Sequence, residues 1–410
     1  MTALKKAFFP ILIVLFLGYL GFSLVLPLFP PLFLEPDRMF LPHTASQPAR
    51  RILLGLLFAM YPIGQFIGAP ILGKLSDKYG RKPLLLLSFS AIIPTYVGCA
   101  LAITYTWPLL LFLSRFLCGL LEGNVVIAQA AIADISENQA AKTKNFGWLV
   151  SFSSLAFFFG PLIGSTLSSS HLVSWFHYDT PFWAAAFLVC CGLLAVYYLF
   201  KETTSPKPDM ELSIKKTFAS FIEGVRLPRL TPLFAAHFLI FLAMFFFLNF
   251  FSAFLISRFH FTILQLGQAN AYLSLFLIIS PVIFKQFARY FPPHQTLIIG
   301  SIFLGVSLVF FSQAATHWSL LLILIPTGMS LAIGFAFPAI LISEQVDKST
   351  QGQALGTNLS IQVLAEALTA LIGGFLLASW SGLPLIIGAL CSWLGGALLF
   401  FLFYTKRLWK

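Results

Sequence analysis

The 410-residue chain is 59% hydrophobic and 16% aromatic, and only 10% of its residues are charged. Soluble domains carry about 25% charged residues, so a water-soluble fold is excluded and the lipid bilayer must be the main solvent. All five cysteines lie inside apolar runs, where a free cysteine behaves as a small hydrophobe, and this excludes a secreted disulfide scaffold.

The apolar runs have the length of membrane-spanning helices. A helix needs roughly 20 mostly apolar residues to cross the hydrocarbon layer, whereas an outer-membrane barrel would show short alternating strands. The first run follows two lysines, as a signal peptide would, but it is long and lacks a clear small-residue cleavage site, so we interpret it as a retained span. In chain order, the predicted spans are 8–33, 52–73, 84–104, 107–131, 146–168, 181–200, 232–256, 266–287, 294–314, 318–342, 354–378 and 384–404.

The basic residues predict the orientation. Lys and Arg in short loops resist translocation and mark the cytoplasmic side. The two termini and the loops at 73–83, 134–145, 201–230, 285–295 and 344–352 hold 20 of the 25 basic residues, and the opposite side holds four. We therefore expect both termini in the cytoplasm. The net charge of +11 is then explained by the basic residues that mark the cytoplasmic side, and we expect no nucleic-acid partner.

One polar, proline-bearing loop divides the spans six and six. It predicts an N-terminal half at 1–200, a cytoplasmic central loop at 201–230 and a C-terminal half at 231–410. An amphipathic helix around Leu212–Val225 would lie on the membrane surface. Weak similarity between 70–79 and 281–290 favours duplicated halves, which are typical of transporters.

The strongest motif lies between the second and third spans and contains Gly73, Asp77, Gly80 and Arg81. The glycines permit close helix approach and a tight turn. Asp77 can pair with a cation or cap a helix N-terminus. An ordinary basic loop would not require glycine, aspartate and arginine at this spacing directly after a span.

This stretch resembles the loop 2–3 motif of the major facilitator superfamily, and the resemblance covers nearly the whole chain. Leu17–Pro30, Arg115–Gly119 leading to Asp134, and Gly160-Pro161-Leu162-Ile163-Gly164 are similar to motifs of its twelve-span drug:proton antiporter branch, which includes the tetracycline exporters. The resemblance implies two pseudo-symmetric six-helix halves in a bacterial inner membrane. It also implies a monomer that exports small lipophilic or cationic compounds, with the proton gradient as its energy source and no cofactor.

Two features depart from that branch. Gly18 stands where the tetracycline exporters have an acidic residue, and the span-five motif is incomplete, with Ala156 and Ser165 at its flanks. The family's coupling carboxylate therefore has no direct counterpart at Gly18, and the resemblance alone does not assign tetracycline as the substrate.

Ionisable residues inside spans are costly and usually mark functional sites. Arg115, Glu122 and Gln129 recur every seven residues, nearly two helical turns, and are predicted to share one helix face. Our hypothesis is that Glu122, tuned by Arg115, exchanges a proton against substrate. The alternative is a buried ion pair of Arg115 and Glu122 that merely joins helices.

A second stripe lies on the eleventh span, where Asn358, Gln362 and Glu366 recur every four residues. Glu366 is near the middle of its helix, and we interpret it as a second protonation or binding site; packing is the alternative. His237 lies nearer a membrane surface and is interpreted as a satisfied interfacial histidine, with a proton relay as the alternative.

Polar side chains in otherwise apolar spans predict the lining of a cavity for amphipathic or aromatic ligands. The candidates are Tyr19, Tyr61, Gln65, Asn124, Gln129, Asn249, Asn358 and Gln362.

The predicted function is a proton-coupled secondary transporter, an efflux antiporter for small amphipathic compounds that works by alternating access. The alternative on the same fold is a transporter, exporter or importer, for one metabolite or siderophore, in which Arg115 binds a carboxylate. We expect no enzyme and no metal, because the sequence has no phosphate-binding loop, nucleophile elbow or metal-ligand spacing.

Overall fold

The computed structural model describes residues 3–35, 40–136, 139–204, 214–227, 230–287, 290–347 and 350–404. Within these ranges the chain forms helices and no strand. Twelve stretches are long and apolar enough to cross a membrane, which confirms the predicted all-α class with twelve spans.

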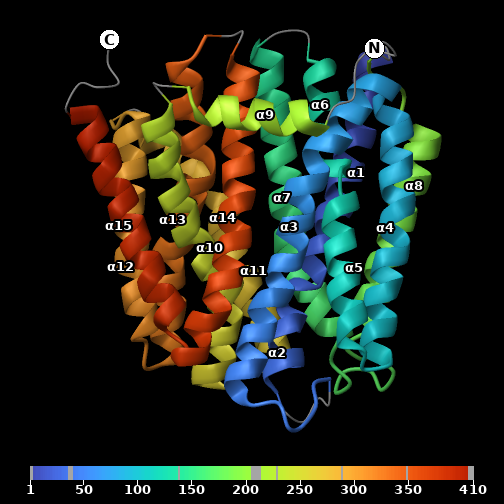
Figure 1. The fold of residues 1–410 in the computed structure, drawn as a ribbon, viewed down its shortest axis with the longest axis vertical. Coiled ribbons are helices and arrows are strands. Elements are labelled where there is room, and N and C mark those ends of the chain that lie inside the picture. The colour runs from blue at the N-terminus through green and yellow to red at the C-terminus, as the bar shows by residue number, and fades with distance from the viewer. Residues whose placement is uncertain are drawn as a thin grey trace. The chain divides into compact units, whose positions relative to one another are not determined.

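The first nine elements run from the N-terminus to the central loop (Figure 1). They are α1 (Ala3–Leu24), the 3₁₀ helix η1 (Leu26–Leu28), α2 (Phe29–Leu34), α3 (Gln47–Tyr79), α4 (Arg81–Thr104), α5 (Pro108–Leu121), α6 (Asn124–Asp134), α7 (Gln139–Leu167) and α8 (Thr180–Leu199).

The remaining helices run from the central loop to Tyr404. They are α9 (Ile214–Val225), α10 (Thr231–Phe259), α11 (Ile263–Phe287), α12 (Pro293–Ser312), α13 (His317–Gln345), α14 (Gln351–Ser379) and α15 (Leu383–Tyr404). Helix α9 forms where a short amphipathic helix was predicted; Leu212 and the loop residues 205–213 and 228–229 lie outside the described residues.

Two predicted spans are not single helices. The first is interrupted after Leu24, where Pro27 and Pro30 remove backbone donors and η1 replaces the α-helix. The fourth is interrupted between α5 and α6, with Glu122 as the C-cap of α5 and Gly123 as the N-cap of α6. Irregular backbone at membrane depth is tolerated only where protein groups satisfy it, so these breaks are features to explain.

The motif at 73–83 is mostly helical, although it was predicted as a loop. Helix α3 continues through Tyr79 and α4 begins at Arg81, so Gly80 alone connects them. The φ of Gly80 is 101°. Backbone conformations with such a positive φ are adopted almost only by glycine, and this confirms the expected tight turn.

Contacts divide the chain into two compact units. Unit 1 contains Met1–Thr44, Met60–Ile214 and Phe261–Ala271; unit 2 contains Ala45–Ala59, Lys215–His260 and Tyr272–Lys410. Helices α3 and α11 thus each contribute residues to both units. The boundaries predicted at 200 and 230 stay a prediction.

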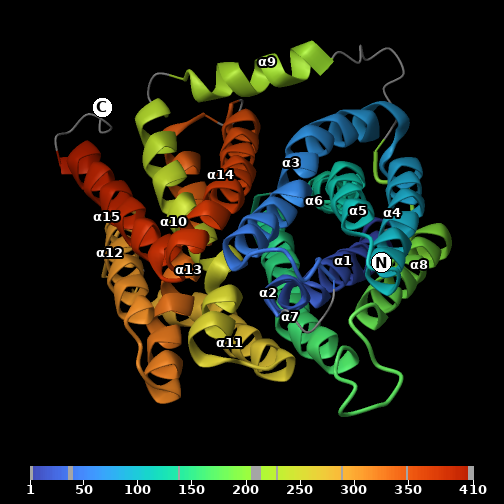
Figure 2. The same cartoon turned by 60° about the horizontal axis from the view of Figure 1, so that its bottom comes forward.

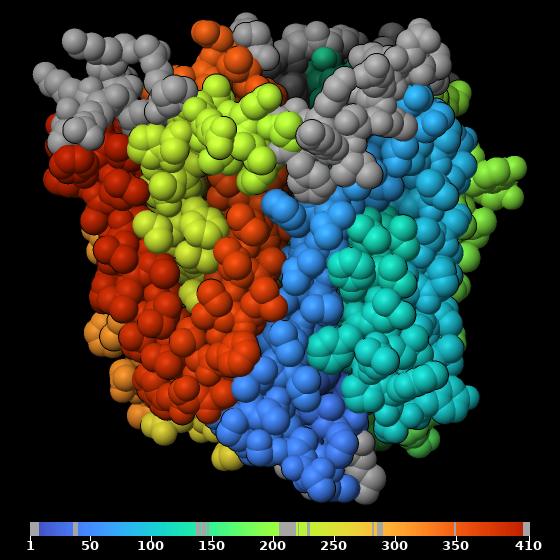
Figure 3. Space-filling view, in the orientation of Figure 1, coloured from blue at the N-terminus to red at the C-terminus, as the bar shows by residue number. Residues whose placement is uncertain are grey.

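In unit 1, α1 packs against α7 and α8, and α4 packs against α5 and α8. Helices α5 and α6 lie between α3 and α4 (Figure 2). The side chains of α4 and α5 meet without a gap on the face turned to the reader in Figure 3. Leu109 and Leu113 of α5 are 75% and 52% exposed, which suits a face that contacts lipid.

In unit 2, α10 contacts α13, α14 and α15, and α12 packs against α13 and α15. Helix α9 crosses the end of this unit instead of running along its spans (Figure 1). Gly224 of α9 lies so close to α14 that an added Cβ would overlap the hydroxyl of Thr357. Glycine therefore lets α9 dock on α14.

Candidate functional site

Tyr61 of α3 and Glu122 at the end of α5 come together because the two helices approach closely. A Cβ added at Gly64 would overlap the carbonyl oxygen of Phe116, and one added at Gly119 would overlap that of Tyr61. Small residues permit such contacts between membrane helices. The glycines therefore determine which side chains face Glu122.

Glu122 is buried in unit 1 and is hydrogen-bonded. Its side chain is 3% exposed, and its Oε2 accepts a hydrogen bond from Oη of Tyr61. Within the described part of the chain, no Lys, Arg or His nitrogen lies within 4.0 Å of this carboxylate. Arg115 and Glu122 therefore do not form the ion pair that was the alternative interpretation.

Ser88 of α4 satisfies the backbone at the break beside Glu122. Its hydroxyl donates to the carbonyl oxygen of Leu121 at 2.7 Å and accepts from the backbone N–H of Gly123 at 3.1 Å. Ser88 is 1% exposed, so water does not compete for these groups. The same two backbone groups also bond to each other at 2.9 Å, so the Ser88 side chain adds two hydrogen bonds at the place where α5 ends.

The break changes one prediction. Gln129 lies half-buried on α6, whereas Arg115 lies on α5 and Glu122 at its end. The prediction that these three residues share one face of a single helix is wrong, because a glycine and a cap residue interrupt the helix between them.

Arg115 is 4% exposed and lies among aromatic rings. Its Cζ is 4.9 Å from the ring centroid of Tyr61, 5.2 Å from that of Phe29 and 5.9 Å from that of Phe22. Its Nη1 is buried without a hydrogen-bond partner among the described residues. The guanidinium is therefore held by cation–π contacts and keeps an unused donor.

The other unit 1 candidates differ in burial. Asn124 is 3% exposed and faces α1, where a Cβ at Gly18 would lie 2.6 Å from its Nδ2. An acidic side chain at position 18 would therefore have to displace Asn124. Tyr19 is half-buried with its ring 5.8 Å from that of Phe157. Gln65 is half-buried on α3.

In unit 2, α10 faces the polar stripe of α14. Nδ2 of Asn249 donates to the Glu366 carbonyl oxygen at 3.5 Å and to the Thr369 hydroxyl at 3.3 Å. The Glu366 side chain is half-buried, as is that of Gln362. The contact with Asn249 involves the backbone of Glu366, so it leaves the role of its carboxyl group a prediction.

His237 is more buried than its interfacial interpretation implies. It is fully buried, and its Nδ1 lies 3.2 Å from Oδ1 of Asn358. Its Nε2 has no hydrogen-bond partner among the described residues. The prediction of a satisfied histidine holds for one ring nitrogen and is wrong for the other.

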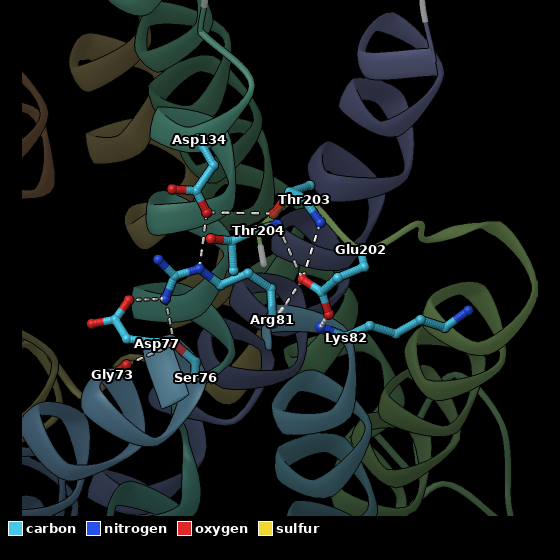
Figure 4. A network of polar contacts seen from close by, with 9 residues as sticks. All are labelled: Gly73, Ser76, Asp77, Arg81, Lys82, Asp134, Glu202, Thr203 and Thr204. Atoms are coloured by element: carbon cyan, nitrogen blue, oxygen red, sulfur yellow. Dashed lines mark hydrogen bonds and ion pairs between the residues drawn. The ribbon is translucent and has the colours of Figure 1, made fainter. Parts of the chain in front are cut away.

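The motif at 73–83 forms a polar network with α6 and with residues that follow α8 (Figure 4). Arg81 binds Asp77 at 2.6 Å and Asp134 at 3.0 Å. Glu202 accepts from the backbone N–H groups of Arg81 at 2.9 Å and Lys82 at 3.0 Å. The side chain of Glu202 therefore caps α4, and Asp77 is a partner of the Arg81 cation.

Gly73 has only an ordinary contact, since an added Cβ would lie 3.5 Å from the nearest atom, a Val126 methyl carbon.

The span-five motif packs α7 against the interrupted end of α1. A Cβ at Gly160 would overlap the side chain of Ser23, and one at Gly164 would overlap the carbonyl oxygen of Leu24. Pro161 lies within α7. Gly160 and Gly164 are thus required by a close contact at the place where α1 ends.

Sequence reasoning missed two residues that complete these sites. Ser88 gave no signal, because a serine in an apolar span usually bonds to its own helix. Glu202 gave no signal either, because a helix cap formed by a residue more than a hundred positions away has no sequence signature.

Comparisons with known proteins identify the family and the fold of the chain. The family model for the Major Facilitator Superfamily matches residues 11–312. The tetracycline resistance protein, class H, of Pasteurella multocida is 25% identical over 404 residues, 94% of each chain. The human organic anion transporter MFSD10 (TETRAN) gives a TM-score of 0.74 at 20% identity over 97% of this chain and 100% of that one. A D-xylose–proton symporter gives 0.76 at 15% identity over 96% and 97%. The chain therefore belongs to the major facilitator superfamily of membrane transporters, and its curated relatives include tetracycline resistance proteins of the drug-exporter branch.

Proposed function

We propose that the protein is a proton-coupled efflux antiporter that moves small amphipathic or drug-like compounds by alternating access. It acts as a monomer in a bacterial inner membrane, with both termini in the cytoplasm and the proton gradient as its energy source. Membership of the superfamily and the similarity to a tetracycline resistance protein support this function.

The hydrogen bond between Tyr61 and Glu122 is the observation that carries the proposal. An ionised carboxylate accepts from the tyrosine hydroxyl, and a protonated carboxyl group can still bond to it, because a hydroxyl both donates and accepts. Glu122 can therefore gain or lose a proton without breaking a buried ion pair. A group with two satisfied protonation states is what a coupling site requires.

Glu366 is proposed as a second protonation or binding site. It is half-buried on α14, and its carbonyl oxygen is held by Asn249. Intramembrane carboxyl groups usually face a cavity or a partner, which supports a role in binding or coupling.

A transporter for one carboxylated compound is a second candidate. It is favoured by Arg115, because no carboxylate of the described residues lies within 4.0 Å of its guanidinium. A bound carboxylate would supply the missing partner.

Transport in proteoliposomes tests the proposal. Tetracycline and ethidium serve as cargo, a pH gradient is imposed, and a dye reports the internal pH. Glu122→Gln is expected to lower gradient-driven transport at least about tenfold, which corresponds to ~1.4 kcal/mol. Glu223→Gln is the matched control, since Glu223 is exposed on α9. Wild-type proton flux in Glu122→Gln would exclude Glu122 from coupling.

A further inference from the structure

Arg115 lacks the partner that a buried cation normally has. A guanidinium carries five N–H donors. The rings of Phe22, Phe29 and Tyr61 lie beside the guanidinium of Arg115, but aromatic rings do not supply strong hydrogen-bond acceptors for five donors. Its Nη1 is buried with no acceptor among the described residues. A native buried polar group left in this state calls for an explanation.

The neighbouring acid does not supply that partner. Glu122 is bonded to the hydroxyl of Tyr61, and it forms no ion pair with Arg115. The other buried charged residue of unit 1 is Arg81, whose guanidinium is paired with Asp77 and Asp134. Within the described ranges of unit 1, Arg115 is thus a buried cation that has no carboxylate within 4.0 Å of its guanidinium.

We infer that Arg115 binds the anionic group of a lipophilic organic anion, such as an aromatic carboxylate, whose apolar body packs against Phe22 and Phe29. This rests on the proposed function in one respect, that the cargo reaches the interior of unit 1. The planar guanidinium matches a carboxylate with two parallel hydrogen bonds, which a lysine cannot reproduce. Aromatic walls with one fixed charge also suit an amphipathic ligand.

Tyr61 connects this binding site to the proton site. Its ring centroid is 4.9 Å from Cζ of Arg115, and its hydroxyl donates to Glu122. An anion bound to Arg115 would therefore lie near the residue whose hydroxyl bonds to the Glu122 carboxyl group. Cargo binding and the environment of Glu122 are linked through one side chain.

Equilibrium binding to the purified full-length protein tests the inference. The protein is placed in nanodiscs of phosphatidylcholine, which carries no net charge, and the probes are 2-naphthoate and the neutral 2-naphthamide. A charge-assisted pair predicts that the acid binds about tenfold to a hundredfold more tightly than the amide. Arg115→Met is expected to abolish that preference with little effect on the amide. Arg258→Met is the matched control, because Arg258 is exposed.

Arg115→Lys keeps the charge and is expected to retain part of the preference, so it decides the matter if Arg115→Met does not fold. Equal binding of acid and amide to the wild type would overturn the inference. So would a preference that survives in Arg115→Met. Phosphatidylglycerol offers the same anionic oxygens from a lipid headgroup. If it displaces 2-naphthoate at low mole fraction and its own binding needs Arg115, the site takes a lipid and the cargo assignment is wrong.

This test is independent of the proton gradient. Equal binding of acid and amide to the wild type, with coupled transport intact, would overturn the anion site alone. Acid-selective binding with proton-independent transport would overturn the proposed antiporter alone.

Discussion

At the scale of single residues, Tyr61 contacts both Arg115 and Glu122. Removing its hydroxyl in Tyr61→Phe leaves the ring beside Arg115 but takes the donor from Glu122. A hydrogen bond to a charged group contributes about 1.5–3 kcal/mol, so we expect gradient-driven transport to fall about tenfold or more. The measurement is initial transport rate in proteoliposomes at matched protein content.

Tyr96→Phe is the control for that change. Tyr96 is 1% exposed in the same unit, and its hydroxyl is not hydrogen-bonded to Glu122. If Tyr61→Phe transports at the wild-type rate, or if both variants lose activity equally, the hydrogen bond does not serve coupling.

At the scale of helices, the break between α5 and α6 depends on Ser88. In Ser88→Ala the Leu121 carbonyl oxygen and the Gly123 N–H both lose the Ser88 hydroxyl and keep only their bond to each other at 2.9 Å. A typical hydrogen bond contributes about 0.5–1.5 kcal/mol, so the loss of two should make the variant unfold at a lower temperature than the wild type. Thermal unfolding of the purified protein measures this loss.

Ser301→Ala provides the comparison for Ser88→Ala. Ser301 is 2% exposed, and its hydroxyl bonds to the Ile298 carbonyl oxygen of its own helix. That carbonyl lies inside α12, so the serine is not its required partner and the cost should be small. Equal destabilisation by both substitutions would mean that the Ser88 bridge adds nothing specific.

The turn between α3 and α4 makes a second prediction at this scale. Gly80→Ala would force a side chain into a φ of 101° and place its Cβ 2.6 Å from Oε2 of Glu202. We expect a loss of about 1–3 kcal/mol, because strain and displacement of the α4 cap act together. Gly147→Ala in α7 meets nothing within 4 Å and should be neutral or stabilising. Thermal unfolding compares them, and equal midpoints would contradict this account.

Hydropathy predicted the spans, because roughly 20 apolar residues suffice to recognise a membrane helix. It did not predict the break at Glu122, since the apolar run continues across it and the backbone there is satisfied by Ser88 from another helix. In the same way, the sequence identified Tyr61 and Glu122 as separate polar residues. Their pairing depends on helix contacts at Gly64 and Gly119, which appear only in the fold.

At the scale of the whole molecule, charge placement predicts topology. Helix α8 has 20 residues, and at ~1.5 Å per residue its ends lie on opposite membrane faces. Ser170 precedes this helix and Lys201 follows it, and both are exposed. Since the basic loop at 201–230 resists translocation, Lys201 should be cytoplasmic and Ser170 should face outward.

Cysteine labelling tests that topology. In spheroplasts, a membrane-impermeant maleimide should label Ser170→Cys, whereas Lys201→Cys should react only after the membrane is permeabilised. The unsubstituted chain sets the background: Cys99 and Cys118 are buried, and Cys190, Cys191 and Cys391 are partly exposed within spans. Labelling of Lys201→Cys in intact spheroplasts would reverse the orientation. The proton gradient would then act on Glu122 from the other side, so the same experiment bears on whether gradient-driven transport means export.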